Sequence, residues 1–266
     1  MSFTGAILFT VFAILGTPRA FAVIGNGSQE VDQNHYPPVC KVTITSNNDD
    51  DGRFAICTGT LITPNTVLTA GHCFGQSFSL GENNVDVSCG HGRNAGVKNI
   101  ALPTQKSQWE SEQIPNSNSD YAILTLNSSL KKITPFPVAK DPSLYFQPST
   151  NSAGSLNPGV HCMALGFGKD PSGDLGNLRQ ANLDSVQIAI TATNSPAFPI
   201  NTIISSNQGN ALPVSVSEGD SGGPLICQAP GSNPQLVGVN SRYRIDAKGQ
   251  IIYNEFTPTW QVPLGL

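Results

Sequence analysis

The sequence contains few charged residues and no excess of positive ones. Charged side chains make up 12% of the 266 residues, and the formal net charge is −4. A chain of this kind has no surplus of cations to neutralise a phosphate backbone, so we expect no nucleic-acid partner. No stretch shows a sustained helical period, and no apolar run is long enough to span a bilayer, so we expect no membrane anchor.

Short apolar segments separated by turn residues are what the sequence contains instead. Apolar residues alternate with polar ones around 40–44, 85–89, 160–164 and 186–190, and continuous apolar runs lie at 121–126 and 236–239. The 26 Gly and 20 Pro are scattered between such segments without a repeat. This pattern is typical of antiparallel sandwiches and barrels, and it predicts an all-β protein. The Pro-containing stretch 134–158 is the expected connection between two halves, with an ordinary surface loop as the alternative.

The first residues carry the features of a processing signal. An apolar run from Ala6 to Leu15 is followed by Gly16-Thr17-Pro18 and then by Ala20-Phe21-Ala22, a pattern of small residues typical of cleavage sites. No Lys or Arg precedes the run, which departs from the usual signal peptide, and a buried N-terminal strand is the alternative. We predict a signal peptide over residues 1–22 and a secreted protein, extracellular or periplasmic, because six Cys suit a disulfide-forming compartment.

Ser221 is the strongest candidate for a catalytic residue. It lies in Glu218-Gly219-Asp220-Ser221-Gly222-Gly223-Pro224, which also matches the Gly-x-Ser-x-Gly nucleophile elbow of α/β-hydrolases. That fold requires its catalytic His after the Ser, whereas all four His of this chain precede Ser221. The elbow interpretation is therefore excluded, because it would leave the nucleophile without a base.

A serine hydroxyl needs an imidazole to take its proton and a carboxylate to fix the tautomer of that imidazole. His72 follows an apolar stretch in Leu68-Thr69-Ala70-Gly71-His72-Cys73, and Asp120 opens the apolar run Asp120-Tyr121-Ala122-Ile123-Leu124. A charge at the mouth of an apolar strand usually has a specific partner. His72 and Asp120 are therefore the candidate base and its carboxylate.

These segments, in the order His, Asp, Ser, resemble the trypsin and chymotrypsin family of serine peptidases. Two further segments extend the resemblance over most of the chain after residue 22: Cys57-Thr58-Gly59-Thr60-Leu61-Ile62 and Cys162-Met163-Ala164-Leu165-Gly166-Phe167-Gly168. The resemblance implies one protease domain over 23–266. It would form two antiparallel six-stranded β-barrels, at about 23–140 and about 155–266, with the active site in the cleft between them.

The resemblance also implies roles for individual residues. Ser221, His72 and Asp120 would be the catalytic triad, and the backbone N–H groups of Gly219 and Ser221 would form the oxyanion hole. Ser215 would lie at the base of the primary substrate pocket, where trypsin-like enzymes carry an Asp, so cleavage after Lys or Arg is not expected. The pocket wall would be formed by Ser241, Arg242 and Tyr243. We expect a preference for small or medium apolar side chains because of Tyr243, with an acidic preference through Arg242 as the alternative.

By the same resemblance, Cys57 would pair with Cys73 and Cys162 with Cys227, which leaves Cys40 and Cys89 for a third disulfide. After cleavage behind Ala22 the chain would begin Val23-Ile24-Gly25-Asn26, similar to the mature start of the family. The new ammonium group of Val23 would then form an ion pair with Asp220, so that removal of the signal peptide would itself activate the enzyme.

No metal or other cofactor is expected. Cys89-Gly90-His91 offers too few ligands for a structural zinc site, and His35, His91 and His161 are expected to be structural. The predicted function is that of a serine endopeptidase acting on proteins or peptides, with protein inhibitors as further partners. Two alternatives use the same scaffold: a weakly active or inactive binding protein, and a serine esterase.

Overall fold

The structure is a computed structural model, and it describes residues 24–25, 28–45, 54–74, 85–103, 119–147, 154–170, 172–183, 185–188, 202–206, 214–248 and 250–264. Residues 1–22 and Val23 lie outside this range, as does most of the stretch around 190–213. Within it, the regular elements are strands and four short 3-10 helices. No helix among these residues is long and apolar enough to cross a membrane.

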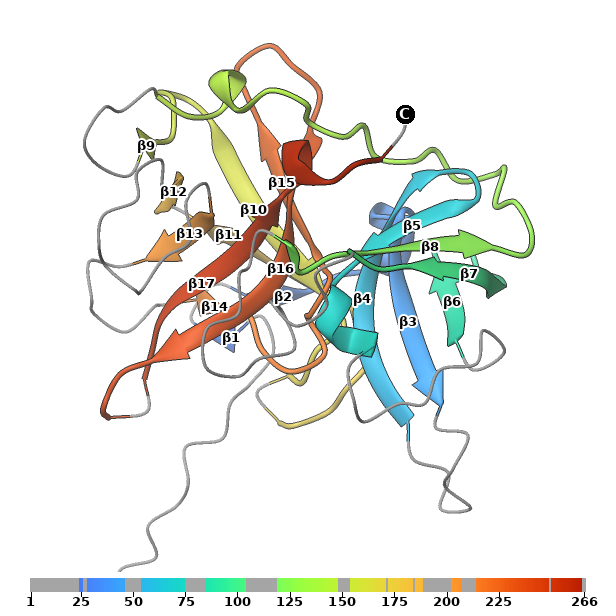
Figure 1. Cartoon of the computed structure of the whole chain (residues 1–266). Coiled ribbons are helices and arrows are strands. Elements are labelled where there is room, and N and C mark those ends of the chain that lie inside the picture. The colour runs from blue at the N-terminus through green and yellow to red at the C-terminus, as the bar shows by residue number, and fades with distance from the viewer. Residues whose placement is uncertain are drawn as a thin grey trace, which may run out of the picture.

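The first half of the chain forms a closed barrel of six antiparallel strands, ordered β3-β4-β5-β8-β7-β6 (Figure 1). The strands are β3 (Val39–Thr45), β4 (Phe54–Thr63), β5 (Thr66–Thr69), β6 (Val85–Cys89), β7 (Arg93–Ala101) and β8 (Ala122–Leu126). Their alternating apolar residues point inward, as Cys40, Val42 and Ile44 do on β3, and are fully buried. The period-2 pattern of the sequence therefore marks the barrel interior.

The second half forms a nine-stranded antiparallel sheet, ordered β2-β11-β10-β15-β16-β17-β13-β12-β9. Its strands are β2 (Gln29–Glu30), β9 (Gly154–Ser155), β10 (His161–Gly166), β11 (Arg179–Leu183), β12 (Val186–Ile188), β13 (Ile203–Ser206), β15 (Pro224–Gln228), β16 (Gln235–Ile245) and β17 (Ile251–Pro258). The sheet curls around a core of its own, centred on residues such as Phe256 and Val237. A separate two-stranded sheet joins β1 (Ile24–Gly25) to β14 (Val214–Ser215).

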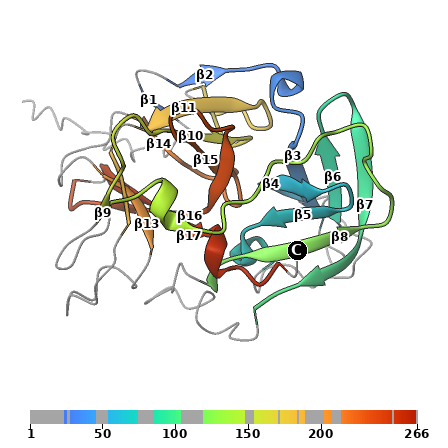
Figure 2. The same ribbon diagram turned by 90° about the horizontal axis from the view of Figure 1, so that it is seen from above.

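The all-β, two-barrel prediction is confirmed, although the second half is an open, curled sheet of nine strands rather than a closed six-stranded barrel, with the short strands β2 and β9 at its two edges. The 3-10 helices are η1 (Gln33–His35), η2 (Gly71–Phe74), η5 (Pro142–Leu144) and η6 (Thr259–Gln261). Figure 2 shows the two halves side by side, with the segment after η6 crossing to the first barrel. There Leu264 packs in a cluster that contains Leu68 of the first barrel and Val239 of the second.

Three disulfides are present among the described residues: Cys40–Cys89, Cys57–Cys73 and Cys162–Cys227. The second and third are the bonds that the sequence resemblance implies, and the first is the pair that was left by elimination. The first joins β3 to the end of β6, the second joins β4 to η2, and the third lies between neighbouring strands β10 and β15. Each bond closes a loop of the unfolded chain, so each restricts the unfolded ensemble.

Candidate active site

His72 and Asp120 are brought together by the register of two strands. Strands β5 and β8 are antiparallel, with Thr69 opposite Ala122, so the end of β5 and the start of β8 lie at the same edge of the first barrel. His72 follows β5 in η2, and Asp120 stands two residues before β8. Residues 48 positions apart in the sequence are therefore neighbours at the barrel rim.

Ser221, His72 and Asp120 form one chain of hydrogen bonds. His72 Nε2 lies 2.8 Å from Ser221 Oγ, and His72 Nδ1 lies 2.7 Å from Asp120 Oδ2. The His72 side chain is 36% exposed, while that of Asp120 is only 5% exposed. This arrangement can move a proton from a serine hydroxyl to an imidazole whose tautomer is fixed by a carboxylate.

Asp120 receives more donors than its partner imidazole alone. The backbone N–H of His72 donates to Asp120 Oδ1 at 2.9 Å, and the hydroxyl of Ser241 donates to Oδ2 at 2.5 Å. Thr257 Oγ1 donates to the backbone carbonyl of Asp120 at 3.0 Å. Sequence reasoning placed Ser241 in the pocket wall and missed its contact with Asp120, because only the packing of β16 against the first barrel creates it.

Asp120 and His72 each shift the pKa of the other toward the charged form. Burial raises the pKa of the Asp120 carboxyl, but the His72 charge and the hydrogen bonds from His72 and Ser241 outweigh this and hold the pKa below its ordinary value. Burial lowers the pKa of His72, but the charge of Asp120 and its hydrogen bond outweigh that effect and raise the pKa above 6.5; the nearby Arg242 opposes the rise. An ionised Asp120 therefore favours the imidazolium form of His72.

The loop that carries Ser221 is fixed by both barrels. Thr58 N–H of β4 donates to the carbonyl of Ser221 at 2.8 Å, and Gly222 N–H donates to the carbonyl of Asn240 in β16 at 2.8 Å. Gly222 has a φ of +82°, and a Cβ there would lie 2.0 Å from Thr69 Oγ1. Only glycine fits at this contact between the barrels.

Position 219 also requires a glycine, because a side chain there would not fit. Its φ is +97°, a Cβ would lie 2.7 Å from the Cα of Gly168, and its carbonyl accepts a hydrogen bond from Thr58 Oγ1 at 2.9 Å. The backbone N–H groups of Asp220, Gly222 and Gly223 donate to backbone carbonyls. Those of Gly219 and Ser221 donate to no other described residue, so both remain available to a bound oxygen.

Asp220 is buried beside the Gly-Phe-Gly part of the second motif. Gly168 N–H donates to its Oδ1 at 3.0 Å and Ser217 N–H to its Oδ2 at 2.9 Å. A Cβ on Gly166 would lie 2.0 Å from the same Oδ1. These glycines therefore leave room for the carboxylate. Val23, its expected partner, lies outside the described residues, but the following Ile24 pairs with Ser215 in the β1–β14 sheet.

Ser215 is buried at the end of β14. Its hydroxyl donates to Asn254 Oδ1 at 3.0 Å, and the same oxygen accepts a hydrogen bond from Val216 N–H at 3.1 Å. Asn254 stands directly opposite Tyr243 in the β16–β17 ladder, and Tyr243 packs against the second core. Asn254 therefore bonds to Ser215 and lies opposite Tyr243 in the ladder, and sequence reasoning missed it.

Arg242 lies on the other face of the same ladder. It contacts the fully buried Glu255, with Nε and Nη2 each 2.6 Å from Oε2, and Arg244 Nε lies 3.2 Å from Oε1. Glu255 and Arg244 were not singled out from the sequence. The signal that could have found Glu255 is the one that found Asp120: a carboxylate in a strand whose neighbours are largely buried.

The fold and this site define a two-barrel protein of the serine-protease class. The family model described as Trypsin matches residues 24–261, and the chain belongs to the trypsin family. It is 31% identical to bovine (Bos taurus) chymotrypsin-C over 194 residues, which is 70% of this chain and 66% of that protein. It is 29% identical to human (Homo sapiens) chymotrypsin-like elastase family member 1 over 213 residues, 77% of this chain and 76% of that protein. The chain thus spans just under two thirds of the bovine relative.

A solved structure with the same fold is that of the scabies mite inactivated protease paralogue S-I1. Its TM-score is 0.59 at 19% identity, covering 89% of this chain and 95% of that one. At this identity the likeness shows the fold alone.

Proposed function

We propose that this protein is a secreted serine endopeptidase that hydrolyses peptide bonds through an acyl-enzyme. The observation that carries the proposal is the hydrogen-bonded chain from Ser221 Oγ through His72 to Asp120, with distances of 2.8 and 2.7 Å. Family membership supports a serine protease and implies protein or peptide substrates. The three disulfides suit an oxidising compartment outside the cytosol.

In this mechanism His72 Nε2 accepts the proton of Ser221 as Oγ attacks the scissile carbonyl carbon. The resulting oxyanion is held by the N–H groups of Gly219 and Ser221, each worth about 3 to 4 kcal/mol in related enzymes. His72 then gives the proton to the leaving amine as the C–N bond breaks. A water molecule, deprotonated by His72, attacks the acyl-enzyme and releases the acid, and the proton returns to Ser221.

The decisive experiment combines labelling with turnover. A peptidyl phosphonate should label Ser221 and abolish hydrolysis together, and Ser221→Ala should lose both. Full activity in Ser221→Ala would refute the assignment of the nucleophile. An unlabelled, inactive wild-type protein would instead favour the inactive binding protein, and turnover of esters without peptides would favour the esterase.

For the primary pocket we propose a preference for small or medium apolar side chains rather than for Lys or Arg. Ser215 and Asn254 carry no charge to meet a cationic side chain, and Tyr243 occupies the position opposite Asn254. The ion pair of Arg242 with Glu255 offsets the positive charge that would attract an acidic side chain. Cleavage of a peptide library tests this, and dominant cleavage after Lys or Arg would contradict it.

We also propose that cleavage behind residue 22 gives the active form, with the ammonium group of Val23 paired to Asp220. Two observations support this: Ile24 lies beside Ser215, and Asp220 is buried a few residues away at the base of the oxyanion loop. N-terminal sequencing of the secreted, fully active protein tests the proposal. A start upstream of Val23 would refute it.

A further inference from the structure

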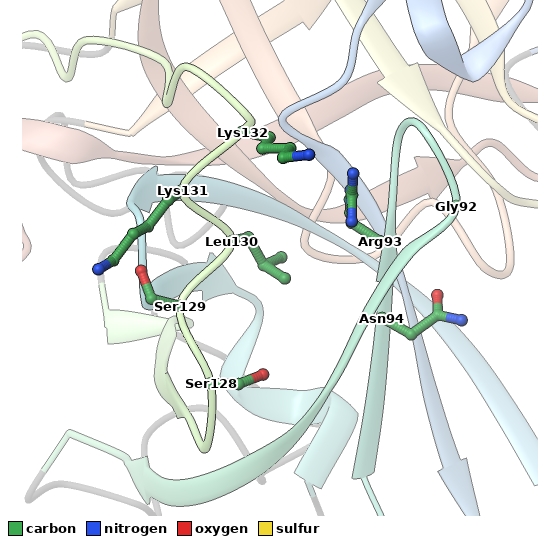
Figure 3. A pocket seen from close by; sticks show the side chains of 8 residues that line it. All are labelled: Gly92, Arg93, Asn94, Ser128, Ser129, Leu130, Lys131 and Lys132. Atoms are coloured by element: carbon green, nitrogen blue, oxygen red, sulfur yellow. The ribbon is translucent and has the colours of Figure 1, made fainter.

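A pocket of about 510 Å³ lies at the end of the first barrel that is remote from Asp120 (Figure 3). It is formed by the turn between β6 and β7 and by the segment that follows β8. The polar side chains that line it are Arg93, Asn94, Ser128, Ser129, Lys131 and Lys132. Its volume is within the range of small-ligand sites, about 300 to 1,000 Å³.

Three of the lining residues are cations, and no acidic residue lines the pocket. In the view of Figure 3 the nitrogen of Lys132 points toward the side of the pocket where Arg93 lies, and Lys131 extends the other way from the same segment. None of the three forms an ion pair with a carboxylate of the described residues. Like charges that line one pocket without a counter-ion repel each other, and a bound anion would reduce that repulsion.

The backbone that carries these cations is held in place. Leu130 is buried in the first core, and its N–H donates to the carbonyl of Pro64. On the other side, Arg93 opens β7 opposite Cys89, which is tied to β3 by the disulfide with Cys40. The backbone positions from which the exposed charged side chains project are therefore set before any ligand arrives, so binding orders only the side chains themselves.

We propose that this pocket binds carboxylate side chains of an acidic segment in a protein substrate. The idea rests on the proposed protease function. A net charge of −4 opposes long polyanions such as nucleic acids or sulfated glycans, which require an extended basic surface, whereas a short concave site suits one or two carboxylates. The hydroxyl of Ser128 is an additional donor for carboxylate oxygens, whereas that of Ser129 donates to the carbonyl of Pro64.

The pocket can be reached from the active site by a single extended peptide. Asp120 lies two residues before β8 and Ser128 lies two residues after it, and eight residues of extended chain span about 26 Å. About eight extended substrate residues cover that distance. The acidic segment is therefore placed about eight or more residues from the scissile bond.

Binding is measured first in the full chain carrying Ser221→Ala, so that the result does not depend on turnover. A labelled peptide ending in three Glu should bind, and the matched peptide with three Gln should bind at least fivefold more weakly. Lys132→Gln should weaken binding about twofold to fivefold, and Arg93→Gln/Lys132→Gln about fivefold to twentyfold, as expected for exposed ion pairs. Lys248→Gln, which removes an exposed Lys from the β16–β17 turn, is the control and should have no effect.

Equal binding of the Glu and Gln peptides, or an equal loss in Lys248→Gln, would overturn the proposal. A sulfated oligosaccharide of the same charge that bound more tightly than the Glu peptide would also overturn it, in favour of a glycan site. The effect should disappear at about 1 M NaCl, where the screening length is about 3 Å.

Kinetics separate this proposal from the proposed function. With an active enzyme, adding the Glu segment to a peptide substrate should lower KM and leave kcat unchanged, and Arg93→Gln/Lys132→Gln should remove the gain without changing turnover of a short substrate. Turnover with no gain from the Glu segment would refute the pocket alone. No turnover of any substrate, with the Glu peptide still bound, would refute the protease function and leave an acidic-peptide site.

Discussion

Replacement of Asp120 by Asn tests how the imidazole of His72 is held. Three donors converge on this carboxylate: the backbone N–H of His72, the Nδ1–H of His72 and the hydroxyl of Ser241, at 2.9, 2.7 and 2.5 Å. An Asn has the same shape but only one acceptor oxygen. When that oxygen faces the His72 backbone, the amide NH₂ faces Nδ1. The imidazole proton then moves to Nε2, which can no longer take the proton of Ser221.

The expected loss in kcat is about 10⁴-fold, the effect of the same change in the triad enzymes on which the mechanism is based, or about 5.5 kcal/mol in activation free energy. The pH profile changes as well. In the wild type the pKa of His72 is raised above 6.5, so activity should fall as the pH decreases through that raised value and His72 becomes protonated. Without the Asp120 charge, burial and Arg242 both lower the pKa, so the acid limb should move to lower pH.

The assay is kcat/KM for a short peptide substrate across about pH 5 to 9, with Ser221→Ala as the background control. Thermal unfolding at the wild-type temperature shows that the variant is folded. A loss smaller than about tenfold, or an acid limb at the wild-type pH, would refute the role assigned to Asp120.

Three further changes test other parts of the structure. Gly219→Ala places a Cβ 2.7 Å from the Cα of Gly168 at a φ of +97°. The substitution should therefore displace the oxyanion donors and lower kcat about 10² to 10³-fold. An unchanged kcat would contradict the oxyanion role proposed for the Gly219 N–H. Glu255→Gln leaves Arg242 and Arg244 without their buried counter-charge. It should lower the free energy of unfolding, measured by urea denaturation, by about 3 to 5 kcal/mol. A loss below about 1 kcal/mol would show that these ion pairs contribute little to stability. Replacement of both Cys162 and Cys227 by Ala opens a loop with a sequence separation of 65. It should lower the free energy of unfolding by about 4 kcal/mol, because the unfolded chain is no longer restricted by the disulfide. An unaltered urea midpoint would contradict this chain-entropy argument.

The sequence by itself determined the elements and the identity of the chemical groups. Alternating residues such as Val85 and Val87 predict a strand because successive side chains of a strand point to opposite faces, and both are buried in β6. The motifs around His72, Asp120 and Ser221 also predicted the family. Each motif reflects a requirement within its own short segment, such as a glycine where no Cβ fits beside Ser221, or the Asp120 carboxylate at the mouth of an apolar strand.

Only the tertiary structure decided which groups meet. The hydroxyl of Ser241 donates to Asp120 because β16 packs against the first barrel, 121 residues away in sequence, and no local pattern encodes that distance. Arg242 stays a predicted part of the pocket wall; the cross-strand register brings it to Glu255, while Tyr243 and Asn254 face the other side. Periodicity fixes the face of a residue within its own strand, but the register between strands depends on long-range packing, and this packing assembled the site.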